Sequence, residues 1–244
     1  MMKIGHRGAP GNPRFAENTF SSFQKALTLG ADAIEFDVRR AGEDSVVFHD
    51  QTLERMTQGG WHTPVKDLSH NALNSICTRY VQETGIAYIP RLWDVLMTFG
   101  NRCFLHIELK ERGLVEEVKN MIIKLRLQKS VCISAFDFGD EDGGDIAESS
   151  WKELCYFGPE IRFAFIASQK KVASLGLRAY ILTAQSIGAS TIHTRSSAVT
   201  DTLILYAHDA GLRVNVFVAN EPTEILRLKR LGVDGIISDF PELL

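Results

Sequence analysis

The chain has 244 residues, of which 45% are hydrophobic and 23% are charged, and its formal net charge is −3. A chain of this length can bury a large core, and it could form either two domains or one α/β barrel. The small negative charge argues against a nucleic-acid partner, and the lack of an apolar run of about 20 residues argues against a membrane span.

A short apolar run, a loop and an amphipathic stretch alternate from the N-terminus onward. The first strand begins at Ile4, and Asn18-Thr19 is expected to cap a helix that Gly30 ends. A strand at 33–38 follows, with a short strand-like extension at 46–48. Residues 51–91 then interrupt the rhythm with a mixed, polar stretch, so we expect an insertion made of short helices and turns.

The rest of the chain alternates predicted helices with predicted strands. The clearest helix is 113–127, where apolar residues recur at helical spacing. A helix within 172–187 has no clear bounds because Gly176 weakens its pattern. Asn220 is expected to cap the last long helix, which Gly232 follows. The other predicted segments are helices at 92–100, 148–157 and 200–210 and strands at 104–109, 131–134, 162–166, 190–193, 213–218 and 235–238.

These segments form eight strand-and-helix units, which begin at Ile4, Ala33, Phe104, Val131, Arg162, Ser190, Arg213 and Gly235. Helical crossovers of this kind connect parallel strands, so the alternation predicts a parallel sheet. The predicted fold class is α/β, a (β/α)8 TIM barrel with a small insertion after the second strand, forming a single domain over 1–244. An open, doubly wound sheet is less favoured, because no Gly-x-Gly-x-x-Gly follows a strand.

The four cysteines are widely spaced and form no Cys-x-x-Cys motif; they are Cys77, Cys103, Cys132 and Cys155. We expect reduced, buried thiols, and neither a disulfide framework nor a zinc–thiolate site. The N-terminal segment begins on a predicted strand and lacks the apolar stretch of a signal peptide. The expected location is therefore cytoplasmic, with no stable membrane association.

Polar residues gather at the carboxyl ends of the predicted strands, which form the active-site face in (β/α)8 enzymes. These residues are His6, Asp37, His49, Lys110 and Asp239. Glu35 and Asp37 share one face of their strand because residues i and i+2 point the same way, and Glu108 and Lys110 do so on another strand. Buried carboxylates require a partner. Glu35, Asp37 and Glu108 therefore predict a site for one hard divalent cation, Mg²⁺ or Ca²⁺, which prefers oxygen ligands.

Two cations and two imidazoles accompany the carboxylates. Arg7 offers a planar fork to phosphate and Lys110 offers a point charge, so the set suits a phosphate ester held beside a metal ion. His6 and His49 can change protonation near neutral pH. One can take a proton from the attacking hydroxyl while the other protonates the leaving alkoxide. A phosphodiester requires both transfers because its leaving alcohol is a poor one.

These residues stand in motifs that resemble, in order, those of the glycerophosphodiester phosphodiesterase family: His6-Arg7-Gly8, Glu17-Asn18-Thr19, Glu35-x-Asp37, His49-Asp50-x-x-Leu53-x-Arg55, Glu108-x-Lys110 and Gly232-Val233-Asp234-Gly235. The resemblance covers almost the whole chain. It implies the (β/α)8 barrel, the two histidines as an acid/base pair, the three carboxylates as metal ligands, and Arg7 and Lys110 as phosphate contacts. It also implies a small-molecule glycerophosphodiester substrate that is hydrolysed to an alcohol and sn-glycerol 3-phosphate.

Three segments depart from the family pattern, of which the turn at 40–44 keeps its turn character. Phe217 stands where the family usually has Trp, so we expect an aromatic substrate contact that lacks the indole N–H. The acidic, glycine-rich stretch 137–145 does not fit an EF-hand. Two alternatives remain open: a lysophospholipase D-like or cyclic-phosphate-forming enzyme that uses the same site, and a barrel that binds phosphodiesters without catalysis.

Overall fold

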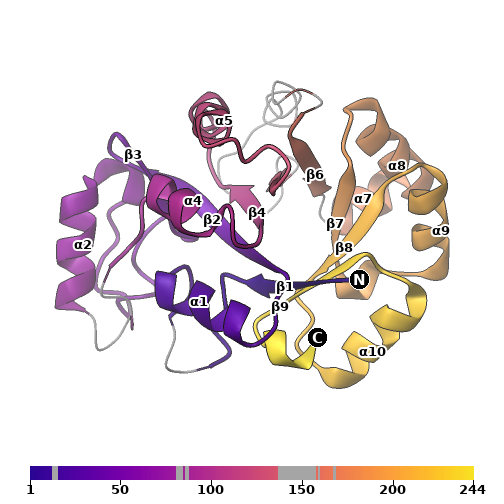
Figure 1. The fold of residues 1–244 in the computed structure, drawn as a ribbon, viewed down its shortest axis with the longest axis horizontal. Helices are drawn as coiled ribbons and strands as arrows, with labels where there is room; N and C mark the ends of the chain where they lie inside the picture. Colours follow the sequence, from indigo (N-terminus) through magenta and orange to yellow (C-terminus); the bar gives the residue numbers. More distant parts are fainter. Residues whose placement is uncertain (13–15, 81–84, 86–87, 137–157, 159, 167–168) are drawn as a thin grey trace.

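The computed structural model describes residues 1–12, 16–80, 85, 88–136, 158, 160–166 and 169–244. Eight parallel strands form one sheet that closes on itself, because β1 pairs with both β9 and β2 (Figure 1). These strands are β1 (Met2–His6), β2 (Ala33–Ala41), β4 (Phe104–Leu109), β5 (Val131–Phe136), β6 (Arg162–Ile166), β7 (Thr191–Arg195), β8 (Arg213–Phe217) and β9 (Gly235–Ser238). The predicted (β/α)8 barrel is therefore confirmed.

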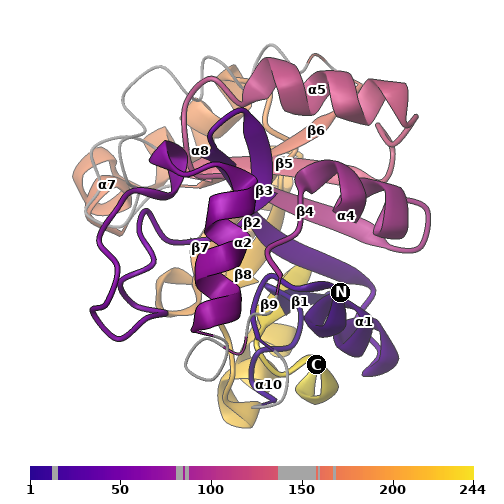
Figure 2. The ribbon, with the colours of Figure 1, turned by 90° about the vertical axis from the view of Figure 1, so that its left-hand side faces the viewer.

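Helices cover the outside of the barrel (Figures 1 and 2). They are α1 (Phe20–Thr28), α2 (His70–Arg79), α4 (Leu92–Phe99), α5 (Val115–Lys124), α7 (Gln169–Leu175), α8 (Leu177–Ser186), α9 (Asp201–Asp209) and α10 (Pro222–Leu231), with short 3-10 helices η1 (Val65–Asp67), η3 (Ser196–Ala198) and η4 (Pro241–Leu243). Apart from α2 and η1, which belong to the insertion described below, the long helices pack their apolar faces against the outward-facing strand residues in one large core. Phe23 of α1, for example, lies 5.6 Å from Phe36 of β2 between ring centroids. Among the described residues, no helix combines the length and the apolarity that crossing a bilayer requires.

The second strand continues into a hairpin. β2 runs to Ala41, turns at Gly42-Glu43 and pairs with the antiparallel strand β3 (Asp44–Val47), which accounts for the predicted extension. The predicted insertion at 51–91 contains η1 and α2, so short helices are confirmed there. It has its own apolar cluster, formed by Ala41, Val46, Phe48, Leu53, Val65, Leu73, Ile76, Cys77 and Ile89. The insertion therefore packs on the β2–β3 hairpin, at the left of Figure 1.

Two helix predictions differ from the structure. The segment 172–187 forms two helices because Gly176 has a φ of +78°, a left-handed conformation that ends α7 before α8 begins. The predicted cap at Asn220 is wrong, because Glu221 is the N-cap of α10 and the Asn220 side chain bonds to residues after β9. The predicted helix at 148–157 and the acidic stretch 137–145 lie outside the described residues.

The interior of the barrel contains several polar side chains. His106 of β4, Cys132 of β5 and His193 of β7 are each 2% exposed. The two imidazole ring centroids lie 5.4 Å apart. Cys77 and Cys132 are buried as expected, whereas Cys103 is half-buried; all three are free thiols, and Cys155 lies outside the described residues.

Acid is expected to destabilise the fold through His193. Burial lowers the pKa of His193 from its ordinary 6.5 to about 4. Between these two values the unfolded chain binds a proton that the folded chain does not bind, so the free energy of unfolding falls as the pH falls. The slope is up to about 1.4 kcal/mol per pH unit. Urea unfolding with a chelator present should show a smaller slope for His193→Gln, whereas His62→Gln, at a side chain that is 68% exposed, should retain it. An unchanged slope in His193→Gln would contradict this expectation.

Candidate active site

A tight turn after β1 carries two of the predicted site residues. His6 ends β1, and Arg7 follows with a φ of +51°. Gly8 has a φ of +94°, and a Cβ atom there would lie 2.3 Å from the Ser22 Oγ of α1, so only glycine fits without a shift of the backbone. The Ser22 hydroxyl donates to the Arg7 carbonyl (3.1 Å) and accepts from the Ala9 N–H (2.8 Å). Helix α1 therefore fixes the turn and the direction of both side chains.

Three carboxylates from two neighbouring strands meet at the carboxyl end of the barrel. The pairing of β2 with β4 sets Asp37 opposite Glu108, and Glu35 lies two residues before Asp37 on the same face. One carboxylate oxygen from each of the three side chains lies within 4.8 Å of the others. Glu35 and Asp37 are buried, and the Glu108 side chain is 12% exposed. The structure thus brings together all three side chains that the sequence predicted as metal ligands.

The two predicted phosphate contacts lie against this cluster. The Arg7 Nε lies 3.0 Å from one oxygen of Asp37, and the Lys110 Nζ lies 3.1 Å from the other. Lys110 also contacts Glu108, and the Arg7 backbone N–H donates to Glu35 at 3.2 Å. Two cations therefore face three carboxylates, which leaves the group one positive charge short of neutrality.

Glu35 is the carboxylate that lacks a full counter-charge. Burial and the neighbouring charge of Asp37 raise the pKa of Glu35 to about 8. Burial also opposes the ionisation of Asp37, but Lys110 and Arg7 outweigh it and hold the pKa of Asp37 well below its ordinary value. For the same reason the pKa of Lys110 is raised, because Asp37 and Glu108 outweigh the effect of its burial. A divalent cation among the three carboxylates would supply the charge that Glu35 lacks, so the residues fit such an ion.

His6 is held by a carboxylate on its far side. Its Nδ1–H donates to Asp239 at 2.6 Å, and its Nε2 lies 4.0 Å from a Glu35 oxygen. Burial opposes the protonation of His6, but the bond to Asp239 and the charge of Glu35 outweigh it and raise the pKa of His6. Asp239 is fixed in turn by Asn220, whose Nδ2 donates to it at 2.6 Å and whose Oδ1 accepts its backbone N–H at 2.9 Å. The imidazole therefore presents Nε2 toward the carboxylate cluster.

His49 has a parallel arrangement. Its Nδ1 donates to Asp50 at 2.6 Å, and the second Asp50 oxygen accepts from the Arg55 Nε at 2.6 Å. Burial opposes the ionisation of Asp50, but these two bonds outweigh it and lower the pKa of Asp50 to about 2. His49 lies close enough for its charge to lower the pKa of Asp37. Both predicted histidines are thus oriented by an ionised carboxylate and lie near the same cluster.

Several residues that support the site had been assigned no part in it from the sequence. Glu17 accepts from Arg7 at 3.1 Å and from Arg55 at 2.6 Å, so it joins the two histidine-bearing loops. Asn18 donates to Asp37 at 3.0 Å. Both residues belong to the family-like motif Glu17-Asn18-Thr19, and this motif could have indicated a role in the site. Asn220 was assigned only as a helix cap, although it ends the stretch 217–220 that resembles the late-strand pattern of the family.

Phe217 is placed differently from the other predicted site residues. It ends β8 and is half-buried, and it packs on the apolar cluster of Ile4, Ala33 and Ile237. The guanidinium of Arg195 lies 5.9 Å from its ring centre. Packing thus accounts for its contacts, and its role in substrate binding stays a prediction.

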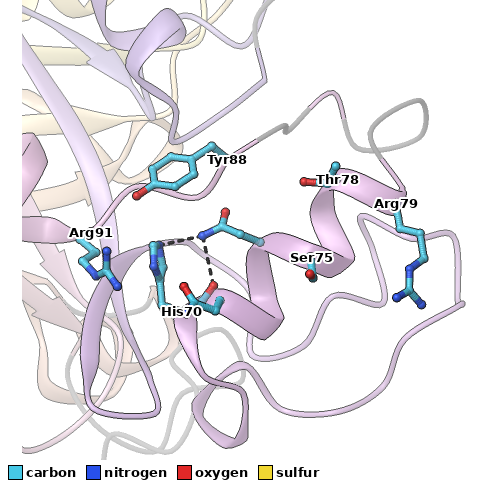
Figure 3. A pocket seen from close by; sticks show the side chains of 8 residues that line it. His70, Ser75, Thr78, Arg79, Tyr88 and Arg91 are labelled. Atoms are coloured by element: carbon cyan, nitrogen blue, oxygen red, sulfur yellow. Dashed lines mark hydrogen bonds between the residues drawn. The ribbon is translucent and has the colours of Figure 1, made fainter.

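A pocket of about 560 Å³ lies away from this site, on the insertion beside α2 (Figure 3). His70 and Asn74 form part of its wall and tie α2 to the following chain: the His70 Nε2–H donates to the Ile89 carbonyl at 2.8 Å, and the Asn74 Oδ1 accepts the Ile89 N–H at 2.7 Å. None of the predicted site residues lines this pocket. We therefore assign the candidate active site to the carboxyl end of the barrel.

The chain is similar to known proteins over nearly its whole length. Residues 6–243 match the model of the glycerophosphoryl diester phosphodiesterase family. A glycerophosphodiester phosphodiesterase of Bacillus altitudinis is 29% identical, over 99% of this chain and 96% of its own. The crystal structure of a glycerophosphodiester phosphodiesterase from Agrobacterium tumefaciens strain C58 is 28% identical, with a TM-score of 0.76 over 100% of this chain and 98% of that one. An Oleispira antarctica phosphodiesterase, solved in complex with the product sn-glycerol-3-phosphate, is 25% identical, with a TM-score of 0.72 over 98% and 93% of the two chains. The chain therefore belongs to the glycerophosphoryl diester phosphodiesterase family of enzymes.

Proposed function

We propose that this enzyme hydrolyses glycerophosphodiesters to an alcohol and sn-glycerol 3-phosphate, with the help of one divalent cation. The observation that carries the proposal is the meeting of three carboxylates, two of them buried, with two cations and two carboxylate-oriented histidines at one end of the barrel. The relative from Oleispira antarctica, whose structure contains sn-glycerol-3-phosphate as the product, supports the same product here.

Glu35, Asp37 and Glu108 would hold the cation. All three offer carboxylate oxygens, which suit Mg²⁺ or Ca²⁺ better than a soft metal. When bound, such an ion polarises a phosphoryl oxygen and offsets the negative charge that develops in the transition state. The raised pKa of Glu35 supports a cation at this position, since the chain itself leaves that carboxylate without a full counter-charge.

Arg7 and Lys110 adapt the site to a phosphodiester. A divalent cation and three carboxylates together carry one negative charge, and the two side-chain cations convert that to one positive charge. A phosphodiester carries a single negative charge, so the complete site would be neutral with its substrate bound. Arg7 and Lys110 already lie on the two oxygens of Asp37, so both cations are ordered before the substrate arrives.

His6 and His49 would move the protons. In each case the Nδ1–H bonds to a carboxylate, and this leaves Nε2 as the free nitrogen. One imidazole takes the proton of the attacking hydroxyl, and the other donates a proton to the leaving alcohol. The attacking group is either a water molecule or the neighbouring hydroxyl of the glycerol. The glycerol hydroxyl has a higher effective concentration at phosphorus than free water has.

The products decide between this function and its alternatives. Phosphorus NMR of the protein with glycerophosphocholine, glycerophosphoethanolamine, glycerophosphoglycerol and glycerophosphoinositol should show sn-glycerol 3-phosphate. A lysolipid keeps its acyl chain when the same bond is cleaved, so it would give an acylated glycerol phosphate instead. A chelator should stop its formation, and Mg²⁺ or Ca²⁺ should restore it, because the carboxylates alone repel the phosphate. A cyclic phosphate as the end product would instead indicate the lysophospholipase D-like alternative. Binding without turnover, across all of these diesters and both ions, would indicate a barrel that only binds.

A further inference from the structure

A second group of metal-binding side chains lies inside the barrel, apart from the carboxylate cluster. His106, Cys132 and His193 come from three different strands, and their ligand atoms all lie within 4.8 Å of one another. The pairing of β4 with β5 sets His106 directly opposite Cys132. Inward-facing residues of neighbouring barrel strands form layers, and this explains how ligands far apart in the sequence meet.

Among the described residues, no hydrogen bond stabilises the buried imidazole of His106. Its Nδ1 and Nε2 are both buried, and neither has a partner among the described residues. A buried polar atom without a partner costs about 1–3 kcal/mol. His193 has a weak alternative, since its Nε2 lies 3.2 Å from the Asn215 amide. Two buried imidazoles around a thiol, one of them unsatisfied, indicate a site that a ligand completes.

We propose that His106, Cys132 and His193 bind one borderline-soft divalent transition metal, for which Zn²⁺ is the probe. Zinc takes imidazole nitrogen at about 2.0 Å and thiolate sulfur at about 2.3 Å, so the side chains must close by about 1 Å. The Cys132 thiol releases its proton to solvent as the sulfur–metal bond forms. Three protein ligands leave the fourth tetrahedral position for water. Sequence analysis argued against a zinc–thiolate site, because the three ligands are far apart along the chain and form no spaced motif.

A pocket of about 310 Å³ reaches this group from the opposite end of the barrel to the carboxylates. His106 and Cys132 line it, together with residues that begin strands, such as Phe104 and Arg213. Arg162 and Arg213 also line this pocket, and Asp234 on the same wall offsets part of their repulsion of a cation.

Cobalt(II) can test the site because its absorption spectrum depends on which atoms bind it. The metal-free, full-length protein should bind one equivalent of Co²⁺ with a strong thiolate-to-cobalt charge-transfer band, and one equivalent of Zn²⁺ should remove that band. The carboxylate cluster cannot produce the band, since it contains only oxygen ligands. Cys132→Ser should abolish the band and weaken Zn²⁺ binding by about 100-fold or more, since the loss of even an outer partner of a metal ligand costs about 10- to 100-fold. The matched control Cys103→Ser, at a half-buried thiol on another part of the chain, should leave both unchanged.

Absence of the band in the wild-type protein would overturn the proposal, and so would its persistence in Cys132→Ser. If Cys132→Ser does not fold, His193→Gln provides the second test, since it removes one ligand and keeps the thiol. A loss of Zn²⁺ affinity of about 100-fold in His193→Gln would support the site. Unchanged Zn²⁺ affinity in that variant would overturn it.

Discussion

Replacing His49 with alanine is expected to lower kcat for glycerophosphodiester hydrolysis by about 10² to 10⁴-fold, with little change in KM. His49 bonds to Asp50 through Nδ1, and its Nε2 is the nitrogen left for proton transfer. The phosphate contacts Arg7 and Lys110 are separate side chains, so substrate binding should survive the change. Initial rates of alcohol release over a range of substrate concentrations, with Mg²⁺ or Ca²⁺ present, would measure both constants. His6→Ala should behave in the same way, because Asp239 orients that ring in the same manner.

The matched control is His62→Ala. His62 belongs to the insertion, its side chain is 68% exposed, and it forms an ion pair with Glu54. Its loss should therefore leave kcat within a factor of about two. Circular dichroism would establish that all three variants remain folded. Activity within a few fold of wild type in both His6→Ala and His49→Ala would refute the acid/base roles, even if metal dependence were found.

The residues of the candidate site could be predicted because two local rules determine their positions. Alternation along a strand puts Glu35 and Asp37 on one face, and the parallel β2–β4 register then sets Asp37 opposite Glu108. The turn after β1 was marked in the sequence only by the His6-Arg7-Gly8 motif, and the conformation and the close contact with Ser22 that require glycine there came from the structure. Alternation along a strand is thus the rule that neighbouring residues reveal by themselves.

Contacts between distant segments could not be predicted in this way. Asn220 is a plausible helix cap by its neighbours, yet its side chain bonds to Ser238 and Asp239, which the barrel closure brings beside it. The meeting of His106 with His193 depends on how the strands stagger around the barrel, which no single strand specifies. Such contacts are set by tertiary packing, and here packing overrides the local preference.

The largest effect on stability is expected from Asp37→Asn. Asp37 is buried and accepts from Asn18, and both Arg7 and Lys110 lie on its oxygens. Removing its charge leaves the buried Lys110 and the half-buried Arg7 with less compensation, and breaking a buried pair in this way costs about 3–5 kcal/mol. The free energy of unfolding, from urea titration with a chelator present, should fall by that amount. Hydrolysis should also be lost, because a metal ligand and the support of both phosphate contacts disappear together.

Glu35→Gln separates metal binding from structural pairing. The pKa of Glu35 is raised by burial and by Asp37, so its ionised form opposes folding of the metal-free protein above its ordinary pKa. In chelator at neutral pH, Glu35→Gln should therefore be at least as stable as wild type, in contrast to Asp37→Asn. Added Mg²⁺ or Ca²⁺ should stabilise the wild-type protein but not Glu35→Gln, because binding to the folded state alone shifts the equilibrium. Glu54→Gln, at a side chain that is 57% exposed, is the control and should keep the wild-type response to metal. Equal losses of stability in Asp37→Asn and Glu35→Gln would show that the two carboxylates do not divide these tasks.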